Sequence, residues 1–216
     1  MPLSDEQRQH LADIQQAAWE INQSVAVILL ADQVPLPPIP PVLTMILYSQ
    51  RDARWRNTVY ASGCTIGTNG CYVVCVAMIA SLAGYTDEPP EVARKLREAN
   101  CFVGGDLRYL ARVPTAYPKL SCGGLVDWRS GPADLVRLRQ ELEKGPTILE
   151  VDFHPGGTPP PADAHFCIAE SFTADGADLN IVDPWDGTRV KLLQRYALKS
   201  WDLGDAVWGM RLLRVV

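Results

Sequence analysis

The sequence lacks three features: a basic run, a long apolar stretch and a basic, cleavable N-terminal segment. The net charge is −5 over 216 residues. This charge makes binding to nucleic acid or to an anionic membrane surface through a broad positive field unexpected. The longest apolar run near the N-terminus covers only residues 24–31, whereas a spanning helix needs roughly 20 residues. We therefore expect a soluble chain without a signal peptide, either cytoplasmic, virion-associated or exported by another route.

Cysteine and histidine are scarce as well. None of the six cysteines forms a C-x-x-C pair, and the spacing of Cys64, Cys71 and Cys75 is no recognised zinc spacing. A cysteine-histidine zinc module remains an alternative, but we expect neither a metal nor a cofactor. The sequence leaves a disulfide between Cys64 and Cys71, or between Cys101 and Cys122, undecided.

The chain divides into three parts by composition. Residues 1–33 predict a helical arm, in which Ser4 and Gln7 form a capping-box pattern. Residues 34–43 are rich in proline and predict an extended linker. Residues 44–216 are long enough for one domain. The arm could pack against the domain or another copy, or it could tether the chain to a larger assembly.

Within the domain, helical patterns come first and strand-like patterns follow. A strand is predicted at 44–50, then a helix that starts near Cys71 with Thr68 or Asn69 as cap and ends at Gly84. This helix has no polar face, so it should be buried. Further helices are predicted at 89–99 and 132–144, and the strand-like segments after them include 190–196. The order indicates an α+β fold with an antiparallel sheet.

Cys71 stands at the first turn of the buried helix, where unpaired N–H groups and the helix dipole favour a thiolate. This position predicts a nucleophile, although an inert buried thiol is the alternative. Cys75 lies one turn further along among valines. We expect it to be a core residue.

A thiolate nucleophile needs a base, and only three histidines are present: His10 in the arm, His154 in a proline-glycine loop, and His165 at a strand start. The strand holds a side chain most rigidly, which favours His165. If Gly176 ends a three-residue turn, Asp183 falls on the same face as His165 and can orient it. Alternatively, His165 is structural and Asp183 is a turn residue before proline.

Five segments occur in the order of a known family: "YSQRDARW", "NGCYVVCVAMIASLAG", "GPTILEVDF", "DAHFCIAES" and "NIVDPWDG". Together they resemble the papain-like cysteine peptidases of the double-glycine leader-processing family, especially its family thirty-nine-like branch. The resemblance implies a papain-like fold, with Cys71 as nucleophile, His165 as base and acid, and Asp183 as orienting residue. It also implies Gln50 as an oxyanion-hole donor beside the Cys71 backbone N–H.

Two departures from the family pattern concern the substrate. Tyr72 and the valines after it replace a small or polar stretch, and Glu170 and Ser171 stand where a glycine is usual. The resemblance therefore implies a cysteine peptidase acting on peptide or isopeptide bonds, with peptidoglycan among the candidate substrates. A second hypothesis is a catalytically idle papain-like module that serves binding or assembly, with the arm mediating oligomerisation.

Overall fold

The computed structural model describes residues 44–61, 63–153, 164–196 and 202–216, together with Gln7, His10, Asp13, Ile14 and residues 16–18. The chain divides into two compact units, Met1–Val42 and Leu43–Val216. The described residues of the first unit are all helical. The rest of the arm expected at 1–33 and the whole linker expected at 34–43 lie outside the described residues.

The second unit is built on an antiparallel six-stranded sheet with the strand order β5-β10-β6-β7-β8-β9. Its strands are β5 (Leu120–Asp127), β6 (Thr147–Asp152), β7 (Ala164–Phe172), β8 (Leu179–Asp183), β9 (Thr188–Lys191) and β10 (Val207–Val215). Two small hairpins pair β1 (Val59–Ala61) with β2 (Cys64–Thr65) and β3 (Phe102–Val103) with β4 (Asp106–Leu107).

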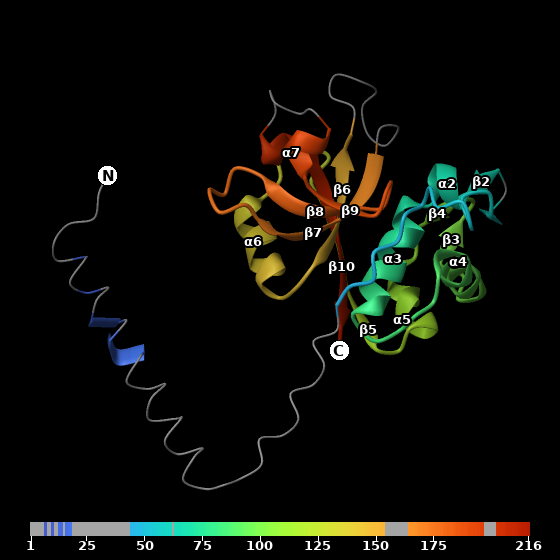
Figure 1. The fold of residues 1–216 in the computed structure, drawn as a ribbon, viewed down its shortest axis with the longest axis horizontal. Coiled ribbons are helices and arrows are strands. Elements are labelled where there is room, and N and C mark those ends of the chain that lie inside the picture. Colours follow the sequence, from blue (N-terminus) through green and yellow to red (C-terminus); the bar gives the residue numbers. More distant parts are fainter. Residues whose placement is uncertain are drawn as a thin grey trace, which may run out of the picture. The chain divides into compact units, whose positions relative to one another are not determined.

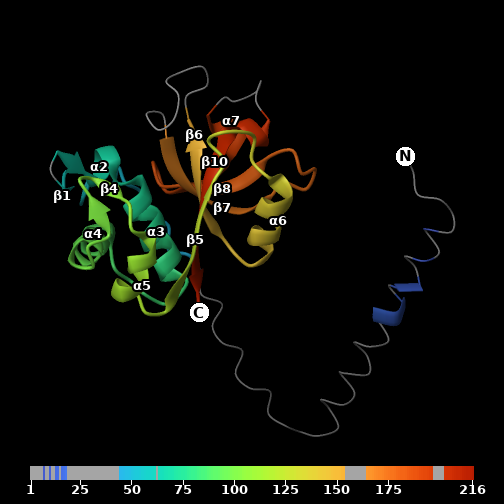
Figure 2. The same ribbon diagram turned by 180° about the vertical axis from the view of Figure 1, so that it is seen from behind.

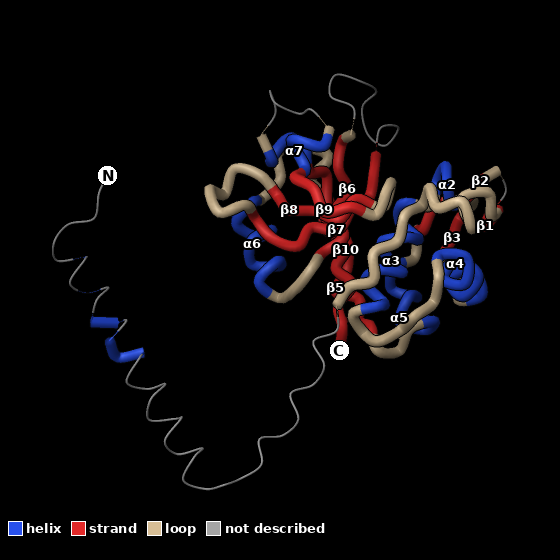
Figure 3. Tube along the Cα trace, in the orientation of Figure 1, coloured by secondary structure: helices blue, strands red, loops and turns tan. Residues whose placement is uncertain are grey.

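The helices divide between the two faces of the large sheet. Figures 1 and 2 show α3, α4 and α5 gathered on one side and α6 and α7 on the other, and Figure 3 separates the helices from the strands by colour. Their bounds are α2 (Ile66–Asn69), α3 (Cys71–Ser81), α4 (Pro89–Glu98), the 3-10 helix η1 (Leu110–Arg112), α5 (Val113–Ala116), α6 (Leu135–Glu143), α7 (Leu192–Arg195) and α8 (Leu203–Ala206). Within the described ranges, no helix combines the length and hydropathy that crossing a membrane requires.

Alternation along β7 produces a separate core on each face of the sheet. Ile168 is fully buried in the cluster that contains α3, whereas its neighbours Cys167 and Ala169 are buried in the cluster that contains Leu138 of α6. Helix α3 is buried from Tyr72 through Ser81, as its sequence predicts. The general α+β arrangement is thus present, with a wholly apolar helix packed on an antiparallel sheet.

The strand expected at 44–50 is wrong. The segment is extended but belongs to no sheet, because its backbone hydrogen bonds go to other partners. The N–H of Ile46 donates to Ser81 Oγ at 2.8 Å, and the N–H of Gln50 donates to Pro184 O at 2.7 Å. These bonds attach the segment to the end of α3 and to the turn after β8.

The hairpin between β7 and β8 reaches the expected register by an unexpected route. Instead of a three-residue turn, the N–H of Thr173 bonds to Asp178 O at 2.8 Å, and Gly176 has a φ of 70°. A register shift between Ala169 and Ser171, at Glu170, then compensates for the longer turn. Beyond it Ala169 pairs with Ile181, the register that the shorter turn predicts.

Two further boundaries and the place of one strand differ from the sequence expectation. Helix α6 begins at Leu135 rather than 132, because the Asp134 carboxylate caps it by accepting from the Arg137 N–H at 2.9 Å. Strand β5 precedes α6 and still joins the large sheet, by pairing with β10. Residues 190–196 are not one strand, since α7 starts at Leu192.

The core on the α3 side should be sensitive to lost volume. We expect Ile168→Ala to lower the free energy of unfolding by about 2–5 kcal/mol, because the buried cavity collapses only in part. The matched control is Ile46→Ala, where the side chain is 38% exposed and the loss should be about 1 kcal/mol or less. Urea unfolding of both variants measures the difference, and equal losses would contradict this packing.

Candidate functional site

Cys71 is the first residue of α3, and a close backbone contact puts it there. The residue before it, Gly70, ends α2 and begins α3, so neither Thr68 nor Asn69 caps the second helix. A Cβ on Gly70 would lie 2.4 Å from Ile66 O. Only glycine therefore allows α2 and α3 to meet this tightly, and Cys71, a half-buried residue, stands at their junction.

His165, on the second residue of β7, interacts with Cys71 and is itself largely buried. Burial alone raises the pKa of the Cys71 thiol, but hydrogen bonding to His165, its charge, and the backbone groups of Phe166 and Tyr72 outweigh burial, so the pKa is lowered. Burial alone lowers the pKa of His165, but hydrogen bonds to Asp183 and Cys71 raise it to about 9. The two opposite shifts favour the charged pair, thiolate and imidazolium, over thiol and imidazole.

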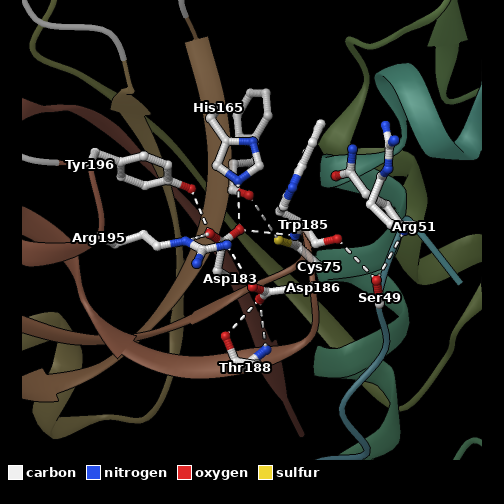
Figure 4. A network of polar contacts seen from close by, with 12 residues as sticks. Ser49, Arg51, Cys75, His165, Asp183, Trp185, Asp186, Thr188, Arg195 and Tyr196 are labelled. Carbon is white, nitrogen blue, oxygen red and sulfur yellow. Dashed lines mark hydrogen bonds and ion pairs between the residues drawn. The ribbon is translucent and has the colours of Figure 1, made fainter.

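Asp183 ends β8 with no exposed surface, and four groups bind its carboxylate. His165 Nε2 lies 3.0 Å from Oδ1, and the Trp185 N–H donates to the same oxygen at 2.9 Å. Arg195 Nε donates to Oδ2 at 2.9 Å and the Tyr196 hydroxyl at 2.7 Å (Figure 4). Although burial raises the pKa of Asp183, these bonds hold it at about 2. Because Asp183 occupies Nε2 of His165, Nδ1 is the nitrogen left for Cys71.

The shifted pKa values also tie folding to pH. The pKa of His165 rises from 6.5 to about 9 on folding, so its contribution to stability is complete below about pH 6.5 and is lost as the pH rises through about 9. The pKa of Asp183 falls from 3.8 to about 2, so its contribution is present above about pH 3.8 and is lost as the pH falls through about 2. The contributions of His165 and Asp183 are therefore both complete between about pH 3.8 and about pH 6.5.

Arg195 and Tyr196 escaped the sequence analysis. Arg195 links two turn carboxylates, since its Nη2 also donates to Asp186 Oδ2 at 2.6 Å. Asp186 in turn accepts from the Thr188 hydroxyl at 2.6 Å (Figure 4). Arg195 and Tyr196 stand at the end of the segment 190–196, whose sequence is strand-like. Nothing in that pattern indicates that the end of the segment turns back toward β8. Only the helical turn α7 brings them to Asp183.

Gln50 is buried and lines the same cavity as Cys71 and His165. Its Nε2 donates to Gly67 O at 3.3 Å, a long bond that leaves its second amide hydrogen unused, and its Oε1 has no partner in the described part of the chain. Two contacts fix its backbone: the bond to Pro184 O, and the Trp55 indole, which donates to Ser49 O at 2.7 Å. The spacing between Gln50 and Trp55 in the sequence thus lets the Trp55 indole bind the backbone next to Gln50.

Trp185 lines the same cavity as His165. Its backbone is bound, because the carbonyl accepts from Ser49 Oγ at 2.9 Å (Figure 4). The indole is 44% exposed and carries the Arg51 guanidinium 4.6 Å from its ring centroid. The side chain is thus part of the cavity rim, with a cation above it.

The other candidates lie apart from this site or outside the described residues. Cys75 is fully buried, its Sγ lies 3.6 Å from Phe166 O, and burial raises its pKa well above the ordinary thiol value, which confirms its place in the core. His10 belongs to the first unit, and His154 is not among the described residues. All six cysteines are free. Across the described ranges, no three His, Cys, Asp or Glu side chains are grouped to hold a metal ion.

A cavity of about 550 Å³ connects these groups. Its walls come from both sides of the domain: α3 and the β3–β4 hairpin on one side, and β6, β7, β10 and the turn after β8 on the other. Cys71 and His165 meet where the two sides join. The arrangement places a thiol of lowered pKa beside a histidine of raised pKa on the wall of one cavity.

Comparison with known proteins adds no family assignment. No protein-family model matches the chain, and no curated protein is detectably similar to it.

The lowered pKa of Cys71 should depend on His165. In the unsubstituted protein, alkylation of Cys71 by iodoacetamide should persist at pH values below the ordinary thiol pKa. In His165→Ala, only the backbone groups of Phe166 and Tyr72 still oppose the effect of burial on the Cys71 pKa, so the midpoint of the rate against pH should rise. Mass spectrometry of the Cys71 peptide measures the rate, and the partly exposed Cys64 is the internal reference. An unchanged midpoint would rule out the ion pair.

Proposed function

We propose that the protein is a cysteine peptidase that hydrolyses peptide or isopeptide bonds through Cys71, His165 and Asp183. The single observation that supports this most strongly is electrostatic: at one cavity wall the pKa of the thiol is lowered while that of its histidine partner is raised. Opposed shifts of this kind mark a nucleophile and its acid-base partner. The papain-like fold suggested by the sequence motifs belongs to the same proposal.

The reaction proceeds in two halves. In the first, the Cys71 thiolate attacks the carbonyl carbon of the scissile bond and a C–S bond forms. The C–N bond then breaks, and the proton of the His165 imidazolium passes to the leaving nitrogen. In the second, neutral His165 takes a proton from water, whose oxygen attacks the thioester. The C–S bond breaks, the carboxyl product leaves, and the thiolate and imidazolium are regenerated.

Asp183 orients the imidazole throughout this cycle. Its carboxylate is itself fixed by Arg195, Tyr196 and the Trp185 N–H, so the histidine cannot rotate away without breaking a bond from a buried group. The remaining requirement is a pair of donors for the oxyanion. We assign these to the backbone N–H of Cys71, at a helix start, and to the amide hydrogen of Gln50 that Gly67 leaves unused.

The catalytic assignment is tested by two cysteine substitutions on one helix. We expect Cys71→Ala to abolish hydrolysis in a screen of short peptides, unfolded protein and peptidoglycan, whereas Cys75→Ala, the matched control, should retain it. The rate of the unsubstituted protein should fall as the pH rises through about 9, because His165 then lacks the proton for the leaving amine. If Cys71→Ala hydrolyses a substrate as fast as the unsubstituted protein, or if no substrate is cleaved, the idle module is the better reading.

The assignment of Gln50 predicts an effect on kcat. Gln50→Ala should lower kcat by about 100-fold or more with little change in KM, since one oxyanion donor is lost. Alkylation of Cys71 should continue at the normal rate, because iodoacetamide needs no oxyanion hole. Gln140→Ala, on the exposed surface of α6, is the matched control. A rise in KM alone would show that Gln50 binds substrate without stabilising the transition state.

A further inference from the structure

A compact group of three charges lines the cavity apart from Cys71 and His165. Glu150 of β6 is buried and accepts two hydrogen bonds from Arg129 Nη2, at 3.0 and 2.8 Å. Arg211 of β10, also buried, donates to Glu150 through its own Nη2. All three residues contribute to the cavity wall. Neither the proposed catalytic cycle nor the packing of the two cores uses them.

The group carries an uncompensated positive charge. Two guanidinium groups face one carboxylate, and the only other acid near Arg129 in the described structure is Asp127, which is half exposed with Oδ2 3.8 Å from Arg129 Nη1. An exposed pair at that distance contributes little. Buried charges are normally paired. Within the described chain, the second positive charge of this wall is thus balanced only by a long contact to an exposed aspartate.

Tyr72 brings a second unsatisfied group to the same wall. It is buried, and its hydroxyl has no hydrogen-bond partner among the described residues. Its ring stacks on Phe166 with centroids 4.4 Å apart, and the Arg211 guanidinium lies 5.4 Å from the centroid of that same Phe166 ring. Burial raises the pKa of Tyr72, so its hydroxyl keeps its proton. The positive charge of Arg211 lowers that pKa in part, which shows that the guanidinium and the hydroxyl interact electrostatically.

The wall also adjoins the reacting groups in the sequence. Tyr72 directly follows Cys71, and Phe166 directly follows His165. Tyr72, Phe166 and both arginines line the same cavity as Cys71 and His165, so a peptide whose carbonyl lies at Cys71 has a neighbouring part of its chain in the cavity that these side chains line.

Building on the proposed peptidase function, we propose that Arg129, Arg211 and the Tyr72 hydroxyl form a subsite for a substrate carboxylate, which makes acidic peptides the preferred substrate class. Guanidinium groups bind carboxylates with charge-assisted bonds that an amide of the same shape cannot replace. Glu150 holds the two arginines in place and neutralises one of them. A neutral peptide would leave the second charge and the tyrosine donor unsatisfied.

Binding of matched peptides to the full chain tests this subsite without requiring turnover. The probes are short fluorescent peptides of alanine and glycine, amidated at the C-terminus, with a single Glu or Gln moved along the chain. With Cys71→Ala protein, we expect the best Glu peptide to bind about tenfold more tightly than its Gln twin. A Glu-free peptide with a free terminal carboxylate distinguishes a terminal from a side-chain carboxylate as the ligand.

Arg129→Gln is the decisive variant, because Arg129 is partly exposed and Glu150 keeps Arg211 as its partner. In the Cys71→Ala background it should reduce the preference to within about twofold. Arg108→Gln, which removes the same charge from another part of the cavity wall, is the matched control and should keep the preference. Unchanged alkylation of Cys71 in Arg129→Gln with Cys71 restored shows that the fold is intact.

The outcomes separate the subsite from the peptidase function. A preference for the Glu peptide without its hydrolysis by the unsubstituted protein would overturn the proposed peptidase and leave the subsite standing. Hydrolysis or binding with equal affinity for Glu and Gln peptides at every position, or no binding of either, would overturn the subsite. A preference that Arg129→Gln and Arg108→Gln reduce equally would also overturn it, because it would then reflect the general charge of the cavity.

Discussion

A carboxylate without exposure to water must be compensated by the groups around it, and the site is arranged around the one at Asp183. Four donors converge on its two oxygens. They are His165 of β7, the Trp185 N–H in the turn after β8, Arg195 of α7 and the Tyr196 hydroxyl directly after α7. The fixed negative charge favours imidazolium over imidazole at His165, and the imidazolium in turn favours thiolate over thiol at Cys71. Each step depends on the one before it. The lowered pKa of a thiol on α3 thus depends, through His165, on a carboxylate on the sheet.

The same turn also fixes the other side of the cavity. The carbonyls of Pro184 and Trp185 accept hydrogen bonds from Gln50 and Ser49, so the segment before α3 is attached directly to the residues that follow Asp183. Gly187 makes this approach possible, because a Cβ there would lie 3.1 Å from the Tyr48 backbone. The turn therefore couples the position of the expected oxyanion donor to that of the orienting acid. The proposed carboxylate subsite lies separately, on the cavity wall that Tyr72 lines.

The sequence predicts some parts of this arrangement because their causes are local. The apolar run after Cys71 requires a buried helix, and Gly176 and the strand periodicity bring Asp183 to His165. The predicted strand register agrees with the structure partly by chance, since the turn is one residue longer than predicted and the bulge at Glu170 shifts the register back by one residue. Arg195 was missed because its role depends on a tertiary contact that no periodicity encodes. The extended segment before Gln50 resembles a strand for the same reason: hydropathy does not say where its hydrogen bonds go.

The central claim is that Cys71 and His165 carry opposite charges at neutral pH. Nitrogen-15 NMR of the His165 ring tests it most directly, because the two ring nitrogens report protonation without any substrate or reagent. We predict that both nitrogens are protonated at neutral pH and titrate near pH 9. In Asp183→Asn the titration should move to lower pH. A neutral ring at pH 7 in the unsubstituted protein would contradict the account.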